Sequence, residues 1–373
     1  MLPQQKLKIA HVVLSLDMGG LEKIVSLMAQ YQHHCGHKVS IICLDRIGAL
    51  GEEIKHLNID IQCLNRLPGR LDIAVLLQLI QFLRQNQFNI VHSHNVEAYT
   101  YAAVAILTSH GARLIHTQHG LPDQFKPVKK LFLRISGSWL GRHISVSRQV
   151  QQQAINSGWT NENKADMITN GIDTSLYVKN ERKRKILRDH YNISENEIVL
   201  IAISRIEPVK DHVTLIRQYS NLCASMNNTR LLIIGDGSLK PAIESMIYEL
   251  GLVDRVTCLG QQSDIIGFLQ MADVYMLTSI SEGISISLLE AMSAELIPIV
   301  TPVGGNTQIV DGKTNGFYLD INNPDSLLRL ISTLYSIKNK PALISSAARD
   351  NICCNFDLTM MMNRYSNHYY SLL

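Results

Sequence analysis

The sequence predicts an α/β protein with two domains, each built around a parallel β-sheet. Two observations predict this class: apolar runs of strand length alternate with longer segments of helical period, and the second half of the chain repeats the alternation of the first. A length of 373 residues allows two ordinary domains, and a hydrophobic content of 46% is enough to fill two cores.

The first half begins with a strand at residues 9–16, a glycine turn, a helix at 21–36 and a strand at 37–45, which make one βαβ unit. Further strands are expected at residues 88–94, 112–120 and 141–147, and further helices at 71–87 and 97–111. Because parallel strands need crossover connections, these elements predict one doubly wound sheet.

The second half repeats this order of elements. Strands are expected at residues 197–205, 229–237, 254–260, 272–279, 296–302 and 315–320. Helices are expected at residues 210–226, 239–251, 263–271, 286–295 and 324–337. The polar and charged stretch at 171–195 marks the boundary, so we expect domains at 1–175 and 176–353.

Charge and composition exclude several classes of function. The net charge is only +3, from 35 Lys and Arg against 32 Asp and Glu, so a whole-domain basic surface for nucleic acid is not expected. The seven cysteines form no C-x-x-C pair, which favours reduced structural thiols. No apolar run reaches the length of a membrane span, and we expect a cytoplasmic protein.

Open parallel sheets bind ligands where their strands end, because helix N-termini with free N–H groups point outward there. Gly19 and Gly20 follow the first strand and could bring backbone close to a phosphate, although two glycines also suit any tight turn into a helix. Arg205 and Lys210 follow the first strand of the second domain, and we expect them to converge on a diphosphate. Neither DMGGLE at 17–22 nor GDGSLK at 235–240 carries the G-x-G-x-x-G pattern of dinucleotide-binding loops, so the sequence does not favour a nicotinamide-dependent enzyme.

The segment SEGISISLLEAM at residues 281–292 places Glu282 in a loop and Glu290 in the helix that follows. We expect that helix to begin at residues 285–287, so that the N–H groups of Gly283, Ile284 and Ser285 are available to an anion. Both carboxylates can accept from sugar hydroxyls. Glu290 follows Leu289 in an apolar stretch, where a carboxylate needs a partner.

Among the histidines, only His119 is predicted to be a site residue, because it ends a strand on the edge where ligands bind. We expect His11 and His116 to be packed core residues. His92 and His94 are expected to point to opposite faces of their strand.

The spacing of Glu282 and Glu290 in E-G-x-x-x-x-x-L-E-A-M resembles the signature of retaining glycosyltransferases of the GT-B fold, in family 4 or group 1. Other motifs agree with this resemblance along nearly the whole chain: Gly19-Gly20, HTQHG with His119, VSR at 146–148, NGID at 170–173, SRIEPVKD at 204–211, GDGSLK at 235–240, VGG at 303–305 and DGKTNG at 311–316. The resemblance implies two facing Rossmann-like domains with a cleft between them, and a C-terminal helix at about 354–373 that returns to the first domain.

The resemblance also implies roles for individual residues. Arg205 and Lys210 would neutralise the diphosphate, and Glu290, beside Leu289, would hold the ribose. Glu282, with the backbone of Gly283, Ile284 and Ser285, would hold the donor sugar. Gly19 and Gly20 would bring backbone to the phosphate, and His119 would line the boundary between sugar and acceptor.

The chain departs from the family pattern at several positions. Ile284 to Ser287 replace a frequent F-G-L-P, Asp211 follows Lys210 where glycine is frequent, and Glu295 stands where a small residue or glycine is common. These departures leave both glutamates in place and weaken any inference about which sugar is bound.

The predicted activity is transfer of a sugar, with retention, from a nucleotide-diphosphate sugar to a glycan, lipid-linked or other hydroxyl acceptor in cell-surface polysaccharide or glycoconjugate synthesis. No D-x-D occurs in the sequence, so no metal or other cofactor is expected. A sugar-nucleotide epimerase, a phosphorylase-like enzyme and a non-catalytic nucleotide-sugar-binding module are the alternatives. An epimerase would need no acceptor, a phosphorylase would need phosphate, and a binding module would show no turnover.

Residues 125–142, FKPVKKLFLRISGSWLGR, interleave basic and apolar side chains. Such a segment could lie on an anionic bilayer and place the protein at the cytoplasmic face of the membrane, near a lipid-linked acceptor. An ordinary amphipathic helix with snorkelling basic side chains is the alternative, and the amount of apolar side chain to be buried favours it.

Overall fold

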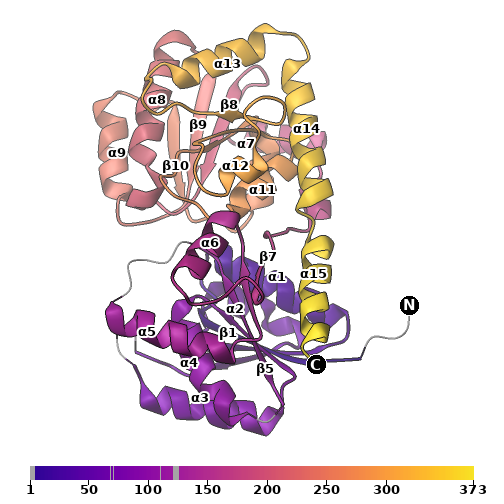
Figure 1. Ribbon diagram of the computed structural model, residues 1–373. Helices are drawn as coiled ribbons and strands as arrows, with labels where there is room; N and C mark the ends of the chain where they lie inside the picture. Colours follow the sequence, from indigo (N-terminus) through magenta and orange to yellow (C-terminus); the bar gives the residue numbers. More distant parts are fainter. Residues whose placement is uncertain (1–4, 68, 70, 110, 121–125) are drawn as a thin grey trace. The chain divides into compact units, whose positions relative to one another are not determined.

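The computed structural model describes residues 5–67, 69, 71–109, 111–120 and 126–373. The chain divides into two compact units, Met1–Gly171 together with Thr359–Leu373, and Ile172–Leu358. Each unit has its own parallel sheet with helices packed around it (Figure 1). The two α/β domains expected from the alternating apolar segments are therefore present.

The first unit contains a seven-stranded parallel sheet with the order β3-β2-β1-β4-β5-β6-β7. Its strands are β1 (Lys8–Ser15), β2 (Lys38–Arg46), β3 (Asp60–Cys63), β4 (Ile90–His94), β5 (Arg113–Gln118), β6 (Arg142–Ser145) and β7 (Ala165–Met167). Its α-helices are α1 (Gly20–His34), α2 (Ala49–Ile54), α3 (Ile73–Asn86), α4 (Val96–Ala105), α5 (Pro127–Ser136) and α6 (Arg148–Asn156).

The second unit contains a six-stranded parallel sheet with the order β10-β9-β8-β11-β12-β13. Its strands are β8 (Ile198–Ile203), β9 (Thr229–Ile234), β10 (Val256–Gly260), β11 (Val274–Leu277), β12 (Ile297–Val300) and β13 (Phe317–Tyr318). Its α-helices are α7 (Glu181–His190), α8 (His212–Ser225), α9 (Lys240–Glu249), α10 (Ile265–Met271), α11 (Ile286–Ser293), α12 (Asn306–Ile309), α13 (Ser326–Ser336) and α14 (Lys340–Asn355).

Both sheets have the same topology, in which the strand order reverses once. The reversal falls between β1 and β4 in the first unit and between β8 and β11 in the second. The central strands are almost fully buried, as expected for parallel strands covered on both faces by helices. Ligands of such sheets bind outside the carboxyl ends of the strands at the reversal, which directs attention to the loops after these four strands.

Helix α15 (Leu358–Ser371) follows the second unit in sequence but belongs to the first from Thr359 onward (Figure 1). Tyr365 and Tyr369, which are 1% and 2% exposed, anchor the helix in the first unit. The hydroxyl of Tyr369 lies 2.7 Å from Nδ1 of His92 on β4, and that of Tyr365 lies 3.1 Å from Oγ1 of Thr117 on β5. The side chains of α15 therefore complete the packing of the first sheet.

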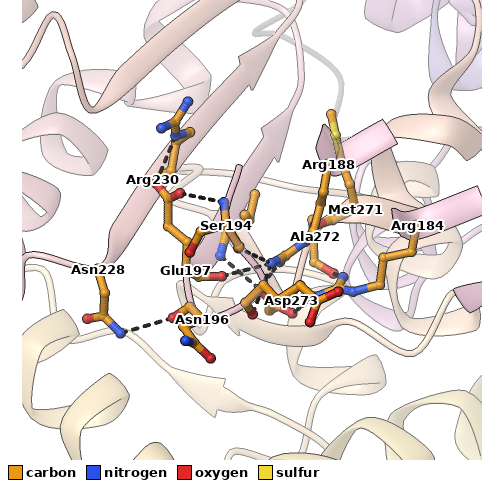
Figure 2. Close-up of polar contacts among 12 residues, drawn as sticks. Arg184, Arg188, Ser194, Asn196, Glu197, Asn228, Arg230, Met271, Ala272 and Asp273 are labelled. Atoms are coloured by element: carbon orange, nitrogen blue, oxygen red, sulfur yellow. Dashed lines mark hydrogen bonds and ion pairs between the residues drawn. The ribbon is translucent and has the colours of Figure 1, made fainter. Parts of the chain in front are cut away.

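A buried ionic cluster of Arg184, Arg188 and Asp273 connects helix α7 to the second sheet. Figure 2 shows Arg184 and Arg188 of α7 converging on Asp273, which immediately precedes β11, with N···O distances of 2.5 and 2.7 Å. The side chain of Arg188 is only 3% exposed and also donates to the carbonyl oxygens of Met271 and Ser194. Asp273 further accepts from the backbone N–H of Val199. A buried charge needs this many partners, so the cluster holds α7 in one position.

Candidate active site

The loops after β8 and β11 meet at the strand reversal of the second sheet. The 3₁₀ helix Pro208–Lys210 lies in the first loop, and Glu282 lies in the second. The backbone N–H of Ile280 donates to the carbonyl oxygen of Val209, and Thr278 donates to that of Lys210. These bonds join the two loops and fix where Lys210 and Glu282 lie.

Lys210 and Glu282 form an ion pair with 2.5 Å between Nζ and Oε1. Their side chains are 17% and 9% exposed, so the pair is shielded from bulk water on most sides. Ser279, two residues after the end of β11, donates to the same Oε1 over 2.6 Å. A cation and a carboxylate are thus held side by side at the edge where a parallel sheet binds ligands.

Arg205 is exposed and makes no ion pair with any part of the chain that the structure describes. Its loop is closely packed, because a Cβ on Gly235, whose φ is +140°, would overlap the carbonyl oxygen of Ser204. The expected convergence of Arg205 and Lys210 on a diphosphate stays a prediction.

Two glycines of the VGG motif lie directly against the backbone of Glu282. A Cβ on Gly304 would overlap the carbonyl oxygen of Glu282, and a Cβ on Gly305 would overlap that of Gly283. The N–H of Gly305 donates to the carbonyl oxygen of Glu282 over 3.3 Å. The motif is visible in the sequence, but only the structure shows that it supports the loop of Glu282.

Helix α11 begins at Ile286, within the range predicted for its start. Ser285 is the N-cap residue, and its Oγ accepts from the N–H of Leu288 over 3.4 Å. Ile284 is 6% exposed and Leu289 is fully buried, so the side chain of Leu289 belongs to the core. The roles predicted for Gly283, Ile284, Ser285 and Leu289 in substrate binding stay predictions.

Glu290 is 3% exposed, and its Oε1 accepts from the hydroxyl of Tyr177 over 2.9 Å. The sequence indicated that this carboxylate needs a partner, but it did not identify Tyr177, which lies in the 3₁₀ helix Thr174–Tyr177 just after the NGID motif. Burial and the neighbouring carboxylate raise the pKa of Tyr177, so the hydroxyl stays a donor. The predicted contact of Glu290 with a ribose is not tested by this geometry.

In the first unit, Gly19 and Gly20 follow β1, as expected, and the helix begins one residue earlier than residue 21. Gly20 is the first residue of α1, and Gly19 caps the helix without a side-chain hydrogen bond. A Cβ on Gly19 would overlap the carboxylate of Glu22 in the first turn. The predicted approach of this backbone to a phosphate stays a prediction.

His119 follows β5 and is partly exposed, whereas its Nδ1 atom is buried and has no hydrogen-bond partner among the described residues. Burial lowers the pKa of His119 to about 3, so the imidazole is neutral. Its Nε2 lies 3.1 Å from Nδ1 of His94. A buried, unpartnered ring nitrogen at a strand end is a position from which a ligand could be bound.

Four other histidines lie on the central strands of the first sheet: His11 on β1, His92 and His94 on β4, and His116 on β5. His11 and His116 are fully buried, as predicted. The prediction for His92 and His94 was wrong: both lie in one cluster with His11, with 4.1 Å between the centroids of their own rings. Residues two apart on a strand share a face, which explains the shared location.

Comparisons with known proteins identify the family. The model for glycosyltransferase family 4 matches residues 18–176, and the model for glycosyl transferases group 1 matches residues 183–351. The two matches together cover most of the chain. The protein belongs to the group 1, family 4 glycosyltransferases.

Named relatives span nearly the whole chain. The UDP-Gal:alpha-D-GlcNAc-diphosphoundecaprenol alpha-1,3-galactosyltransferase of Escherichia coli is 23% identical over 388 aligned positions, covering 99% of this chain and 98% of that protein. The GPI3 subunit of the Saccharomyces cerevisiae phosphatidylinositol N-acetylglucosaminyltransferase is 25% identical over 359 positions, covering 91% and 77%.

Solved structures establish the fold as GT-B. The Anabaena protein HepE, crystallised with UDP and glucose, matches with a TM-score of 0.85 at 20% identity, covering 98% of this chain and all of that one. A glycosyltransferase from Rickettsia africae matches with a TM-score of 0.85 at 22% identity, covering 99% of both chains. Within the described part of this chain, every helix is too short or too polar to cross a membrane.

Proposed function

We propose that the protein moves a sugar from a nucleotide-diphosphate sugar to an acceptor hydroxyl, with retention at the anomeric carbon and without a metal ion. The observation that carries this proposal is the ion pair of Lys210 and Glu282 at the strand reversal of the second sheet. An ammonium group suits a phosphate oxygen, and an adjacent carboxylate suits the hydroxyls of the sugar attached to that phosphate.

The chemistry needs charge stabilisation on the leaving group. As the bond between the anomeric carbon and the β-phosphate oxygen breaks, negative charge grows on the diphosphate, where Lys210, Arg205 and the N–H groups at the start of α11 would stabilise it. The acceptor oxygen forms the new bond on the same face, and its proton goes to the β-phosphate oxygen. Glu282 would orient the donor sugar and Glu290 the ribose. His119, directly after β5, stays a candidate for binding the sugar acceptor.

The relatives narrow the substrates that we propose. HepE was crystallised with UDP, and the Escherichia coli relative is named for UDP-galactose and a diphosphoundecaprenol-linked acceptor. A UDP-sugar is therefore the first donor to examine, and a lipid-linked or other glycan is the proposed acceptor, in cell-surface polysaccharide or glycoconjugate synthesis. We propose that the reaction takes place in the cytoplasm.

Helix α5 supports a peripheral contact with the membrane. Val128, Leu131 and Ile135 are 81%, 59% and 53% exposed and lie on one side of the helix, at positions i, i+3 and i+7. Exposed Lys130 and Arg134 stand among them. This combination suits an anionic lipid surface. Phe125, which belongs to the same basic and apolar segment of the sequence, lies outside the described residues.

The test is thermal unfolding with UDP-, GDP- and ADP-sugars and with the free diphosphates, followed by transfer assays in EDTA. One nucleotide class should raise the melting temperature of the wild type, with the effect lost in Glu290→Ala and Arg205→Ala. Turnover should require an acceptor, survive EDTA and give a product of unchanged anomeric configuration by NMR. Sugar conversion without acceptor, dependence on free phosphate, or binding without turnover would each contradict the proposal.

A further inference from the structure

A continuous line of hydrogen bonds runs through the first unit from Gln32 on α1 to His119 after β5. Oε1 of Gln32 lies 2.7 Å from Nε2 of His11, and Nδ1 of His11 lies 2.9 Å from Nε2 of His94. Nδ1 of His94 lies 3.1 Å from Nε2 of His119. We call Gln32, His11, His94 and His119 the histidine row.

Every ring in the row is neutral. Burial lowers the pKa of His11 to about 4 and that of His119 to about 3, and it lowers the pKa of His94 well below its usual value. Gln32, His11 and His94 are 2%, 0% and 0% exposed. A neutral imidazole carries one N–H and one bare nitrogen, so each ring donates through one nitrogen and accepts through the other.

The amide oxygen of Gln32 fixes the direction of the row, because an oxygen can only accept. The proton must therefore be on Nε2 of His11, which leaves its Nδ1 bare to accept from Nε2 of His94. His94 then has a bare Nδ1, which accepts from Nε2 of His119. By this chain of donors, Nδ1 of His119 is bare, and it is the buried nitrogen without a partner in the described ranges.

We infer that Gln32 is a positioning residue that fixes His119 in the tautomer with a bare Nδ1, acting through His11 and His94. The inference rests on the proposed function in one respect: the bare Nδ1 is useful because it can accept a hydrogen bond from a substrate hydroxyl. Gln32 itself lies on the inner face of α1, two rings away from His119, and touches no predicted site residue.

A second branch accounts for the remaining polar groups. Nε2 of Gln32 donates to the hydroxyl of Tyr369 over 3.3 Å, and this hydroxyl lies 2.7 Å from Nδ1 of His92. Nε2 of His92 lies 2.7 Å from Oγ1 of Thr117. The same orientation of the Gln32 amide thus satisfies both branches.

A metal site is the competing explanation, because His11, His92 and His94 each place a ring nitrogen within 4.8 Å of the others. All six ring nitrogens of these residues already have hydrogen-bond partners. A metal ion would displace several of these bonds, and none of the partners is a carboxylate that could balance its charge. The observations therefore favour the hydrogen-bonded row.

The test is the tautomeric state of His119, read from the imidazole ¹⁵N shifts of histidine-labelled protein near pH 7.5, with His119→Gln used to assign the signals. The wild type should show the proton on Nε2 of His119. Gln32→Met keeps the size of the side chain but removes the acceptor, so the His119 proton should move toward Nδ1. Thr117→Val interrupts only the His92 branch and should leave His119 unchanged.

Three results would overturn the inference: a proton on Nδ1 of His119 in the wild type, an unchanged His119 signal in Gln32→Met, or an equal change in Thr117→Val. These measurements need no substrate, so they can fail independently of the proposed function. Where turnover is found, kcat of Gln32→Met should fall about tenfold, as expected for one lost hydrogen bond. A kcat equal to that of Thr117→Val would show that the tautomer does not matter to transfer.

Discussion

Nζ of Lys210 lies 2.5 Å from Oε1 of Glu282, although the two residues are far apart in the sequence and come from different strand ends. If this pair binds the donor, Lys210→Met should lower kcat/KM by roughly 100-fold or more. The reason is that no ammonium group then stabilises the negative charge that develops on the diphosphate leaving group. Glu282→Gln should add little to the loss in the double variant, since the two side chains act as a unit. Lys185→Met, which removes an exposed lysine, is the control, and an equal kcat/KM in Lys185→Met and Lys210→Met would contradict the assignment.

The contact of Gly304 with the Glu282 backbone should be sensitive to a single methyl group. Gly304 has a φ of +50° and no room for a Cβ, whereas Gly251 has a φ of +67° with open space around it. Gly304→Ala combines backbone strain with a clash, while Gly251→Ala carries the strain alone. We expect both proteins to fold and only Gly304→Ala to lose binding of the nucleotide that stabilises the wild type, as measured by calorimetry. Equal affinities would show that the Glu282 loop does not depend on this glycine.

The cluster of Asp273 with Arg184 and Arg188 should dominate the stability of the second unit (Figure 2). Asp273→Asn leaves two guanidinium groups without their carboxylate, and we expect the free energy of unfolding to fall by about 3–5 kcal/mol. Glu52→Gln breaks the exposed pair with Lys55 and should cost no more than about 0.5 kcal/mol. Urea unfolding followed by circular dichroism measures both, and similar losses would mean that the buried cluster contributes little.

The buried imidazoles of the first unit should make the protein sensitive to acid. Burial lowers the pKa to about 4 for His11 and His116, to about 3 for His119, and well below the usual value for His92, His94 and His143. The groups packed around them, Tyr365 and Tyr369, have raised pKa values and remain neutral. An unfolded histidine titrates near 6.5, so the unfolded state binds more protons below that pH and stability falls as the pH is lowered.

For each histidine that stays neutral in the folded state, the free energy of unfolding should fall by about 2 kcal/mol as the pH is lowered from 8 to 5. Urea unfolding at several pH values measures the slope of the free energy of unfolding against pH. His143→Leu removes one such group and should flatten it, whereas His33→Gln changes an exposed side chain and should not. Stability that is constant from pH 8 to pH 5 would show that these rings are protonated in the folded protein.

The exposed apolar side chains on one side of α5, Val128, Leu131 and Ile135, predict binding to anionic vesicles. Leu131→Glu places a negative charge in the middle of Val128, Leu131 and Ile135, and we expect co-sedimentation with phosphatidylglycerol vesicles to weaken by roughly tenfold. Leu343→Glu makes the same change on α14, where the side chain is also exposed, and should leave binding unchanged. Wild-type protein that stays in the supernatant at low salt would remove the basis for the membrane contact.

The sequence predicted the two parallel sheets and most of their strands because buried parallel strands are continuous apolar runs. It missed β3 and β7, which are short and only partly buried, and helix α7, whose outer face is nearly all charged. Helices α2, α6, α12 and α14 were also not predicted. It also placed Lys210 and Glu282 at strand ends. That they meet could not be predicted, since the contact depends on which strands are neighbours in the sheet.

Two departures from the family pattern acquire a physical explanation. Asp211 stands where glycine is frequent and Glu295 where a small residue or glycine is common, and both adopt a left-handed backbone, with φ of 47° and 62°. Asp211 offsets part of this strain by capping α8, where its carboxylate accepts from the N–H of Thr214 over 3.2 Å. The histidine row could not be predicted, because its direction depends on the orientation of one amide side chain.

The placement of α15 sets an order on the folding of the chain during synthesis. Tyr365 and Tyr369 belong to the core of the first unit, yet the ribosome adds them only after the whole of Ile172–Leu358. Until then, the hydroxyl partners of His92 and Thr117 are missing, and the polar groups of this core are incompletely paired. The unit that is made first is therefore completed last. Its first sheet must stay accessible to a helix that is synthesised about 190 residues later, at roughly 5–20 residues per second.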